Sequence, residues 1–289
     1  MNRILIAGAT GMLGTSLSAH LRQFEYEVIS HGFITKADIN FDFTDKYISF
    51  EFLDKIMPDF IINLICLSDV DLNEKDNDLA NKLNVESVKN ISEWISKQKT
   101  QIRFIHVSTD HLYDNAGFNK ENNVTCRNIY ASTKYYSEKV SAQVDACILR
   151  TNFFGKSQNS GRKSFSDWVE SNVKNNIPMN LFNDVYFTPL SLETLCRMIN
   201  HVVKNFKSGT YNLGSNGGMS KSEFAKKLIS SISDKKVTVK DISIDDMGFT
   251  ATRPKGMMMD VLKFEKYFRV KLPTLESEIK THIESIRKL

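Results

Sequence analysis

The chain has 289 residues, of which 41% are hydrophobic, so it can bury one large core or two modest ones. Lysine and arginine number 38 against 34 acidic residues, a net charge of +4, and the basic residues are scattered. This balance does not indicate nucleic acid as a partner, although a mildly positive cleft would suit an anionic ligand. No apolar stretch reaches the roughly 20 residues that span a bilayer, and no signal peptide is evident. We therefore expect a cytoplasmic protein that does not contact a membrane.

The four cysteines lie far apart and form no Cys-x-x-Cys pair. They are Cys66, Cys126, Cys147 and Cys196. Cys66 and Cys147 fall in strand-like apolar runs, so reduced, buried thiols are predicted and a zinc site is not.

Up to about Asn152, short β-branched runs alternate with longer amphipathic segments, which is the pattern of parallel strands joined by crossover helices. Strands are predicted near 3–7, 27–31, 59–65, 102–108 and 146–150. Helices are predicted near 12–24, 46–57, 77–98 and 128–143. Residues 1–152 are thus expected to form an α/β, Rossmann-type doubly wound parallel sheet that binds a dinucleotide.

After Asn152 the alternation is less regular. Helices are predicted near 163–176, 191–205, 221–232 and 274–287, extended pieces near 179–190 and 236–243, and turns around Gly209 and 214–218. Residues 153–289 are expected to form mainly a smaller, mixed α+β substrate-binding lobe, from which some segments return to the first domain.

A glycine-rich turn follows the first predicted strand, with the sequence Gly8-Ala9-Thr10-Gly11-Met12-Leu13-Gly14. Glycine at the first, fourth and seventh positions allows a tight turn and a close approach of a pyrophosphate to the backbone. The start of the next helix would add amide donors and partial positive charge. A plain turn would also use glycine, but this position between strand and helix predicts dinucleotide binding.

The second predicted strand ends in Ser30-His31-Gly32, without the carboxylate that often binds the ribose of NAD. A 2′-phosphate could then lie near His31 or Lys36, so NADP(H) is favoured over NAD(H). Asp42 and Phe43 are placed where the next loop could reach the adenine, although Asp42 could equally cap the following helix.

Tyr130 and Lys134 lie four residues apart in a predicted helix, so their side chains share one face. The lysine charge is expected to lower the tyrosine pKa, which would make the pair a general acid/base for a carbonyl or alcohol. The same spacing also occurs where a tyrosine packs and a lysine snorkels.

Ser108-Thr109-Asp110 ends the fourth predicted strand, at the edge where open α/β sheets bind ligands. Strand alternation directs only one hydroxyl into the cleft, and Thr109 is the choice. His111 is interpreted as a hydrogen-bonded loop residue rather than a catalytic one. The nearby acidic group of Asp69, Asp71 and Glu74 matches no metal-ligand spacing.

The glycine turn, the Ser-Thr-Asp turn and Tyr130-x-x-x-Lys134 occur in the order found in the extended short-chain dehydrogenase/reductase superfamily. In detail the chain most resembles the dTDP-4-dehydrorhamnose reductase family of nucleotide-sugar reductases. Further matching elements are Asp42-Phe43, the run from Asn63 to Asp71, Asn84, Arg150-Thr151, Arg253-Pro254 and Asp260.

The resemblance implies NAD(P)H-dependent reduction of the 4-keto group of a nucleotide-linked deoxysugar, for cell-surface polysaccharide precursors. It implies Thr109, Tyr130 and Lys134 as catalytic residues. The residues it places at the cofactor are Gly8, Thr10, Gly11, Met12, Leu13, Gly14, His31, Asp42, Phe43 and Lys134. Those it places at the substrate are Asp110, Asn152, Phe153, Phe187 and Arg253, with the guanidinium of Arg253 reaching the diphosphate. A homodimer is possible, and no metal site is assigned.

Two segments depart from the family pattern. Asn183-Asp184-Val185-Tyr186-Phe187-Thr188-Pro189 is bulkier than the usual Gln-x-Gly-x-Pro-Thr, and Asn152-Phe153-Phe154-Gly155 is more aromatic. A different deoxysugar or nucleotide is therefore plausible. Two alternatives also stay open: an epimerase or dehydratase on the same scaffold, disfavoured because His111 follows Asp110 where a dehydratase has glutamate, and a non-catalytic dinucleotide-binding regulatory subunit.

Overall fold

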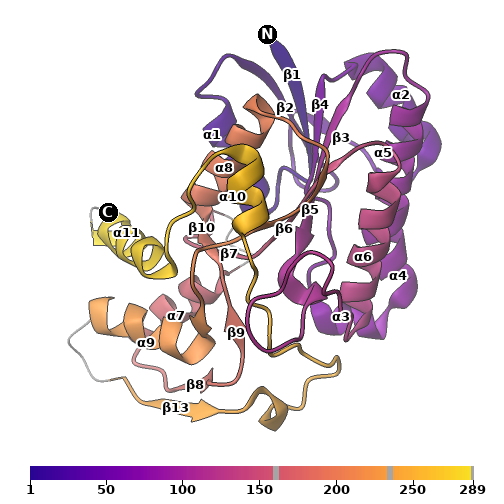
Figure 1. Ribbon diagram of the computed structural model, residues 1–289. Helices are drawn as coiled ribbons and strands as arrows, with labels where there is room; N and C mark the ends of the chain where they lie inside the picture. Colours follow the sequence, from indigo (N-terminus) through magenta and orange to yellow (C-terminus); the bar gives the residue numbers. More distant parts are fainter. Residues whose placement is uncertain (159–162, 233–236, 288–289) are drawn as a thin grey trace.

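Seven parallel strands form the central sheet of the computed structural model, which describes residues 1–158, 163–232 and 237–287 (Figure 1). The strands lie in the order β11 (Gly209–Leu213), β6 (Cys147–Thr151), β5 (Arg103–Thr109), β4 (Phe60–Asn63), β1 (Asn2–Ala7), β2 (Tyr26–Gly32) and β3 (Ile39–Asn40). The direction of strand succession reverses between β1 and β4. Open sheets bind ligands at such a switch point, beyond the carboxyl ends of the strands.

Helices cover both faces of this sheet (Figure 1). One face carries α1 (Met12–Leu21), α8 (Leu192–Lys204) and α10 (Leu262–Phe268), and the other carries α2 (Lys46–Ile56), α5 (Ser87–Ser96) and α6 (Ile129–Ala142). Alternation along β1 explains the two layers, because Ile4 and Ile6 pack with the first group whereas Leu5 and Ala7 pack with the second. The predicted doubly wound α/β fold is confirmed.

A smaller lobe lies beyond the carboxyl edge of the sheet. It comprises α7 (Phe165–Lys174), α9 (Lys221–Ile232) and α11 (Leu275–Arg287), with the strand pairs β8 (Met179–Phe182) with β13 (Val239–Ile242) and β9 (Tyr186–Phe187) with β12 (Met219–Ser220). The pair β7 (Phe153–Phe154) and β10 (Leu190–Ser191) connects the lobe to the sheet. Phe154, Phe187 and Phe224 lie in its own hydrophobic core.

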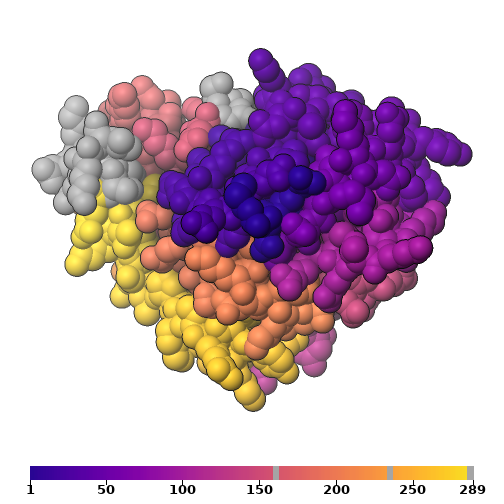
Figure 2. Space-filling model, turned by 90° about the horizontal axis from the view of Figure 1, so that it is seen from above, coloured from indigo at the N-terminus to yellow at the C-terminus, as the bar shows by residue number. Residues whose placement is uncertain are grey.

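Part of the second half of the chain returns to the sheet. The segment at Gly209, predicted as a turn, begins β11, which pairs in parallel with β6. Gly209 has a positive φ of 125°, a conformation typical of glycine in turns, but residues 210–213 then continue as a strand. Helix α8 packs against α1, and the space-filling view shows its orange residues beside the indigo N-terminal segments (Figure 2).

The predicted helix over 77–98 is divided in three: α4 (Asn77–Asn81), a π-helical turn η1 (Lys82–Glu86) and α5. Asn84 in this turn accepts a hydrogen bond from the Leu67 amide (2.7 Å) and donates one to Thr133 Oγ1 (3.0 Å). The widened turn thus anchors the loop after β4 to helix α6. The short helices α3 (Val70–Lys75) and α10 escaped prediction because they are too short to show a clear apolar period. Within the described residues, no helix is long and apolar enough to cross a membrane.

Candidate active site

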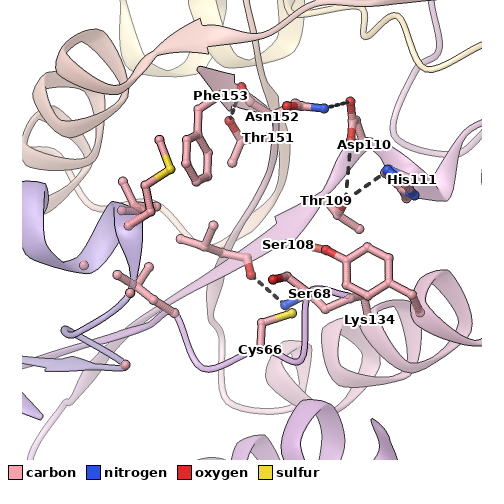
Figure 3. A pocket seen from close by; sticks show the side chains of 18 of the residues that line it. Cys66, Ser68, Ser108, Thr109, Asp110, His111, Lys134, Thr151, Asn152 and Phe153 are labelled. Carbon is pink, nitrogen blue, oxygen red and sulfur yellow. Dashed lines mark hydrogen bonds between the residues drawn. The ribbon is translucent and has the colours of Figure 1, made fainter. Parts of the chain in front are cut away.

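A cavity of about 340 Å³ opens at the carboxyl ends of β1, β4, β5 and β6 (Figure 3). The glycine-rich turn forms one wall, and the end of β5 with helix α6 forms another. Residues from both walls and from the segment after β6 line it, among them Gly8, Gly11, Met12, Leu13, Gly14, Cys66, Ser68, Ser108, Thr109, Asp110, His111, Tyr130, Lys134, Asn152 and Phe153.

The glycine-rich turn packs so closely that two of its glycines have no room for a side chain. Gly8 has a positive φ of 82°, and a Cβ there would lie 2.9 Å from the Ile65 amide nitrogen. A Cβ on Gly14 would lie 2.5 Å from the Gly8 carbonyl oxygen. Gly11 caps α1 without a side-chain hydrogen bond, so the first amides of the helix are left for an anion. These features fit the pyrophosphate of a dinucleotide.

The His31 ring is hydrogen-bonded to this turn and is neutral, so it is not a phosphate-binding cation. Its ring is 2% exposed, Nδ1 accepts a hydrogen bond from the Gly8 amide (3.3 Å), and Nε2 lies 2.9 Å from the Phe41 carbonyl oxygen. Burial lowers the pKa of His31 to about 4, so the ring is neutral at pH 7. The expectation that His31 approaches a 2′-phosphate is therefore corrected: both ring nitrogens already have partners in the protein.

A second cavity, of about 250 Å³, continues from the glycine turn past the ends of β2 and β3. Thr10, Asp42 and Phe43 line it, as does His31, whereas Lys36 is exposed and outside its lining. Asp42 Oδ1 accepts hydrogen bonds from Thr44 (2.9 Å from the amide and 2.7 Å from the hydroxyl). Asp42 is not the helix cap considered as an alternative, because Asp45 occupies that position. This cavity suits the adenosine half of a dinucleotide.

Tyr130 and Lys134 lie in the first turns of α6 and line the main cavity. Lys134 is labelled in Figure 3. Asn128 fixes where the helix begins, since its side chain accepts from the Ala131 amide (2.8 Å) and donates to the Thr252 carbonyl (2.8 Å). Lys134 is buried, and its Nζ donates to the Val107 carbonyl oxygen (2.8 Å). The ammonium is thereby held across the end of β5.

Thr109, rather than Ser108, lies against the phenol. Thr109 is close enough to Tyr130 to lower the pKa of the phenol, and its Oγ1 accepts a hydrogen bond from the His111 amide (3.2 Å). Ser108 instead donates to Glu138 Oε1 (2.5 Å). Because side chains alternate along β5, the Thr109 hydroxyl faces Tyr130 and the Ser108 hydroxyl faces Glu138.

The pKa of Tyr130 is raised well above its usual value, first by burial and next by the neighbouring Cys66. The expected lowering by Lys134 is therefore wrong for this state of the protein, because the Lys134 ammonium is directed to Val107. The phenol is protonated at neutral pH. A protonated phenol suits a proton donor, which is what reduction of a carbonyl requires.

A buried ion pair holds helix α6 to the sheet. Arg150 Nη2 and Glu138 Oε2 lie 2.6 Å apart, both 3% exposed. Arg150 also donates to the Tyr113 hydroxyl (2.7 Å), and Glu138 accepts the Ser108 bond. Because removal of one partner would leave a buried charge unpaired, this network fixes α6, and with it Tyr130, relative to β5 and β6.

On the substrate side, Asp110 and Asn152 form a pair. Asn152 Nδ2 donates to Asp110 Oδ2 (2.6 Å), and both residues line the cavity. Burial raises the pKa of Asp110 to about 6, opposed by the Asn152 hydrogen bond and by Lys221. His111, beside Tyr130 with ring centroids 5.4 Å apart, is neutral because burial lowers its pKa to about 3.

The three remaining residues predicted to bind substrate, Phe153, Phe187 and Arg253, lie in different environments. Phe153 lines the cavity. Phe187 is buried in the lobe core against Phe224, outside the lining of the cavity. Arg253 Nη2 pairs with Asp71 Oδ2 (2.7 Å), which ties the Arg-Pro segment to α3 rather than leaving the guanidinium free.

Several residues near the cavity were not predicted. Cys66 lies in the loop after β4, not in a strand, and contacts Tyr130. Ser68 and Lys163 also line the cavity, and Lys221 at the start of α9 acts electrostatically on Asp110. Cys66 and Ser68 could have been predicted, because the run after Asn63 leaves a sheet strand at the edge where ligands bind. Nothing local distinguished Lys221.

The acidic residues of α3 have structural partners. Asp69 caps α3 through the Leu72 amide (2.9 Å), Asp71 binds Arg253, and Glu74 accepts from the Ile129 amide (3.0 Å). Across the described ranges, no group of three or more His, Cys, Asp or Glu is arranged to hold a metal ion.

Comparison with known proteins gives the family. The model of the RmlD substrate binding domain family matches residues 1–288. A probable low-salt glycan biosynthesis reductase, Agl14, of Haloferax volcanii is 26% identical over 286 residues, covering 95% of each chain. The dTDP-4-dehydrorhamnose reductase of Aggregatibacter actinomycetemcomitans is also 26% identical, over 93% of this chain and 94% of the relative.

Among solved structures, the dTDP-4-dehydrorhamnose reductase of Bacillus anthracis in complex with NADP superposes with a TM-score of 0.86. It is 26% identical, and the match covers 98% of this chain and 99% of that one. The similarity therefore includes both the sheet and the lobe.

Proposed function

The chain belongs to the RmlD substrate binding domain family, and from this membership we propose that it reduces the 4-keto group of a nucleotide-linked deoxysugar with a nicotinamide cofactor. The product would serve the synthesis of polysaccharide or glycan precursors, as the names of its relatives indicate for them.

The observation that carries this proposal is the meeting of two features in one cavity. The glycine-rich turn offers a backbone cradle for a dinucleotide, and the protonated phenol of Tyr130 opens onto the same space. A cofactor held in that cradle would supply hydride to a carbonyl carbon. The carbonyl oxygen then needs a proton donor, and Tyr130 has the chemistry for it.

The chain's own residues divide the remaining work. Thr109, which lies next to the phenol, can donate its hydroxyl proton to the carbonyl oxygen as negative charge develops there. Lys134 lines the same cavity, and its ammonium, which donates to the Val107 carbonyl oxygen, adds positive charge to the site. The Glu138–Arg150 pair keeps the helix that carries both residues in place.

NADPH is the proposed cofactor, with NADH as second choice. The Bacillus anthracis structure was determined with NADP. In this chain the Asp38 carboxylate, in the loop between β2 and β3, is bonded to Ser30 (2.7 Å) and Arg22 (2.6 Å) and so is partly neutralised. A neutralised carboxylate repels a 2′-phosphate less than a free one.

Residues 1–152 are proposed to bind the cofactor, and 153–289 mainly the substrate, with β11 and α8 completing the first part. The aromatic side chain of Phe153 in the cavity wall supports a sugar or nucleotide preference different from that of the rhamnose enzymes. We also propose a cytoplasmic location, and the homodimer stays a prediction that size-exclusion chromatography with light scattering checks.

An epimerase or dehydratase is the second candidate, because Asp110 is a buried carboxyl whose pKa of about 6 suits acid/base work. Its neighbour His111 is neutral and buried, so it adds no second acid. Retention of tightly bound oxidised cofactor through purification would favour the epimerase. A regulatory subunit would have no need of the Tyr130–Lys134 pair.

The test is oxidation of NADPH and NADH, followed by absorbance, with dTDP-, UDP-, GDP- and CDP-linked 4-keto-6-deoxyhexoses. Consumption with one nucleotide class, lost in Tyr130→Phe, is the expected result. Cofactor binding without turnover of any of these sugars would contradict the reductase.

A further inference from the structure

His106 is a fully buried histidine in the middle of β5, and the proposed chemistry does not use it. It is not among the residues that line the cavity. Both ring nitrogens have partners: Nδ1 lies 3.1 Å from Nδ2 of Asn63, at the end of β4, and Nε2 lies 3.0 Å from Oγ of Ser137, on α6. The ring therefore joins the end of β4 to the helix that carries Tyr130 and Lys134.

The Asn63 side chain decides which ring nitrogen carries the proton. Its Oδ1 accepts a hydrogen bond from the Ile65 amide (3.1 Å), so its NH2 group faces the ring. Because an amide NH2 group donates and does not accept, Nδ1 of His106 must accept and carries no proton. Burial lowers the pKa of His106 well below its ordinary value, so the ring is neutral and its single N–H is at Nε2.

Ser137 requires the same tautomer from the other side of the ring. Its hydroxyl donates to the Lys134 carbonyl oxygen (2.7 Å), and a hydroxyl has one proton to donate. The Ser137 oxygen must therefore accept the hydrogen bond from His106 Nε2. The hydrogen bonds thus run in one direction, a set that we call the His106 relay: from the Ile65 amide through Asn63, His106 and Ser137 to the Lys134 carbonyl oxygen.

The two ends of the His106 relay lie at different parts of the site. Ile65 lines the second cavity, and a Cβ on Gly8 would lie 2.9 Å from its amide nitrogen, so the relay begins beside the glycine-rich turn. Lys134 lines the main cavity. The side chains between them are 0% exposed. Because a buried polar network with every member paired favours one arrangement, the relay fixes the loop after β4 relative to α6.

We propose that His106 is a positioning residue: as the neutral Nε2–H tautomer, it ties the loop after β4 to the backbone of Lys134 and so sets the position of α6 relative to the bound cofactor. This inference rests on the proposed function. The ring lies outside the cavity lining, so its effect reaches the reaction through Lys134 and the helix.

The first test cuts the relay at the helix. Ser137→Ala leaves the His106 N–H without an acceptor. We expect kcat with a 4-keto sugar nucleotide, and the affinity for NADPH, each to fall by about 3- to 10-fold, the size of one hydrogen bond. Ser141→Ala is the matched control, because Ser141 is equally buried on the same helix but donates to the Ser137 carbonyl oxygen (2.9 Å). It should lower the unfolding temperature and leave kcat and NADPH affinity per folded molecule unchanged.

The second test separates positioning from packing. Glutamine has an acceptor and a donor at its end, so His106→Gln can keep both hydrogen bonds, whereas His106→Leu fills the space without them. His106→Gln should retain most of the wild-type kcat, and His106→Leu should lose about tenfold or more. Equal losses in the two folded variants, or equal kcat in Ser137→Ala and Ser141→Ala, would overturn the proposal.

Nitrogen NMR of the histidine side chains tests the tautomer in wild type, without turnover. A neutral ring with its proton on Nε2 is expected for His106, whose signals are identified by their loss in either His106 variant. A proton on Nδ1, or a charged ring at pH 7, would overturn the proposal. If no 4-keto sugar is turned over, the proposed function fails, and the NMR spectrum with the NADPH affinities of Ser137→Ala and Ser141→Ala still decides the role of His106.

Discussion

The two walls of the cavity are built in different ways. The cofactor wall comes from one contiguous turn, residues 8–14, in which glycines allow the backbone to pack closely. The substrate wall is assembled from Asp110, Asn152 and Phe153, which come from two separate parts of the chain. A contiguous wall can be read from a short motif, whereas an assembled wall depends on tertiary packing. Variation of substrate within one family should therefore occur mainly in the second wall.

The largest effect is expected where the two walls meet, at Tyr130. Replacing Tyr130 with phenylalanine removes only the phenol hydroxyl and should lower kcat by about 10²- to 10⁴-fold. The ring and its packing against His111 remain, so the affinity for NADPH should not change. Steady-state kinetics and fluorescence titration of NADPH measure the two quantities. A variant within about tenfold of wild-type kcat would exclude Tyr130 as the proton donor.

A side chain added to the glycine-rich turn should disrupt the cofactor wall by crowding the backbone. Gly14→Ala places a Cβ 2.5 Å from the Gly8 carbonyl oxygen, so the turn must shift. We expect a loss of about 1–3 kcal/mol in the free energy of unfolding and at least a tenfold weaker affinity for NADPH. Gly248→Ala is the control, because a Cβ there meets no atom within 4 Å. Equal NADPH affinities in the two variants would show that the turn does not cradle the cofactor.

The buried Asp110 carboxyl in the substrate wall should lower the free energy of unfolding at neutral pH, a cost that the cofactor wall does not have. The native pKa of Asp110, about 6, lies above its ordinary value of 3.8, so the native state binds more protons than the unfolded state between these pH values. The free energy of unfolding should therefore fall as pH rises from about 4 to 6. Asp110→Asn removes this dependence and should be more stable at pH 8, by up to about 3 kcal/mol, but less active.

Urea unfolding of wild type and Asp110→Asn from pH 5 to 8 measures this difference. It should grow between pH 5 and 7 and then level off. Parallel stability curves would show that the Asp110 carboxyl ionises at its ordinary pKa and is not held at a cost.

The smallest effect is expected at the edge of the adenosine cavity. Lys36 is exposed and outside the cavity lining, so Lys36→Ala should change the preference for NADPH over NADH by less than about threefold. Dissociation constants for both cofactors measure the ratio. A loss of tenfold or more in NADPH affinity alone would restore Lys36 as the partner of the 2′-phosphate.

The residues explain which features could be predicted. The parallel sheet, the glycine turn and the placement of Tyr130 beside Thr109 follow from local patterns: apolar runs, glycine spacing and helical periodicity. His31 was misread because its position at the end of a strand says nothing of the two hydrogen bonds that occupy its ring. That some later segments return to the first domain was expected, but the sequence did not identify β11 as one of them, since its pairing with β6 is long-range.

Ionisation was harder to predict than position. The four-residue spacing placed Lys134 and Tyr130 on the same helix at one cavity, but the pKa of the phenol is raised mainly by burial and by Cys66.

The most direct measurement of the central claim is a single turnover with NADPH deuterated at the transferable position, followed by NMR of the sugar product. Transfer of deuterium to the carbon that carried the ketone, with equivalent formation of NADP, is the expected result for wild type, and Tyr130→Phe should show almost none. Sugar without deuterium, or an inverted centre with the cofactor unchanged, would contradict a reductase.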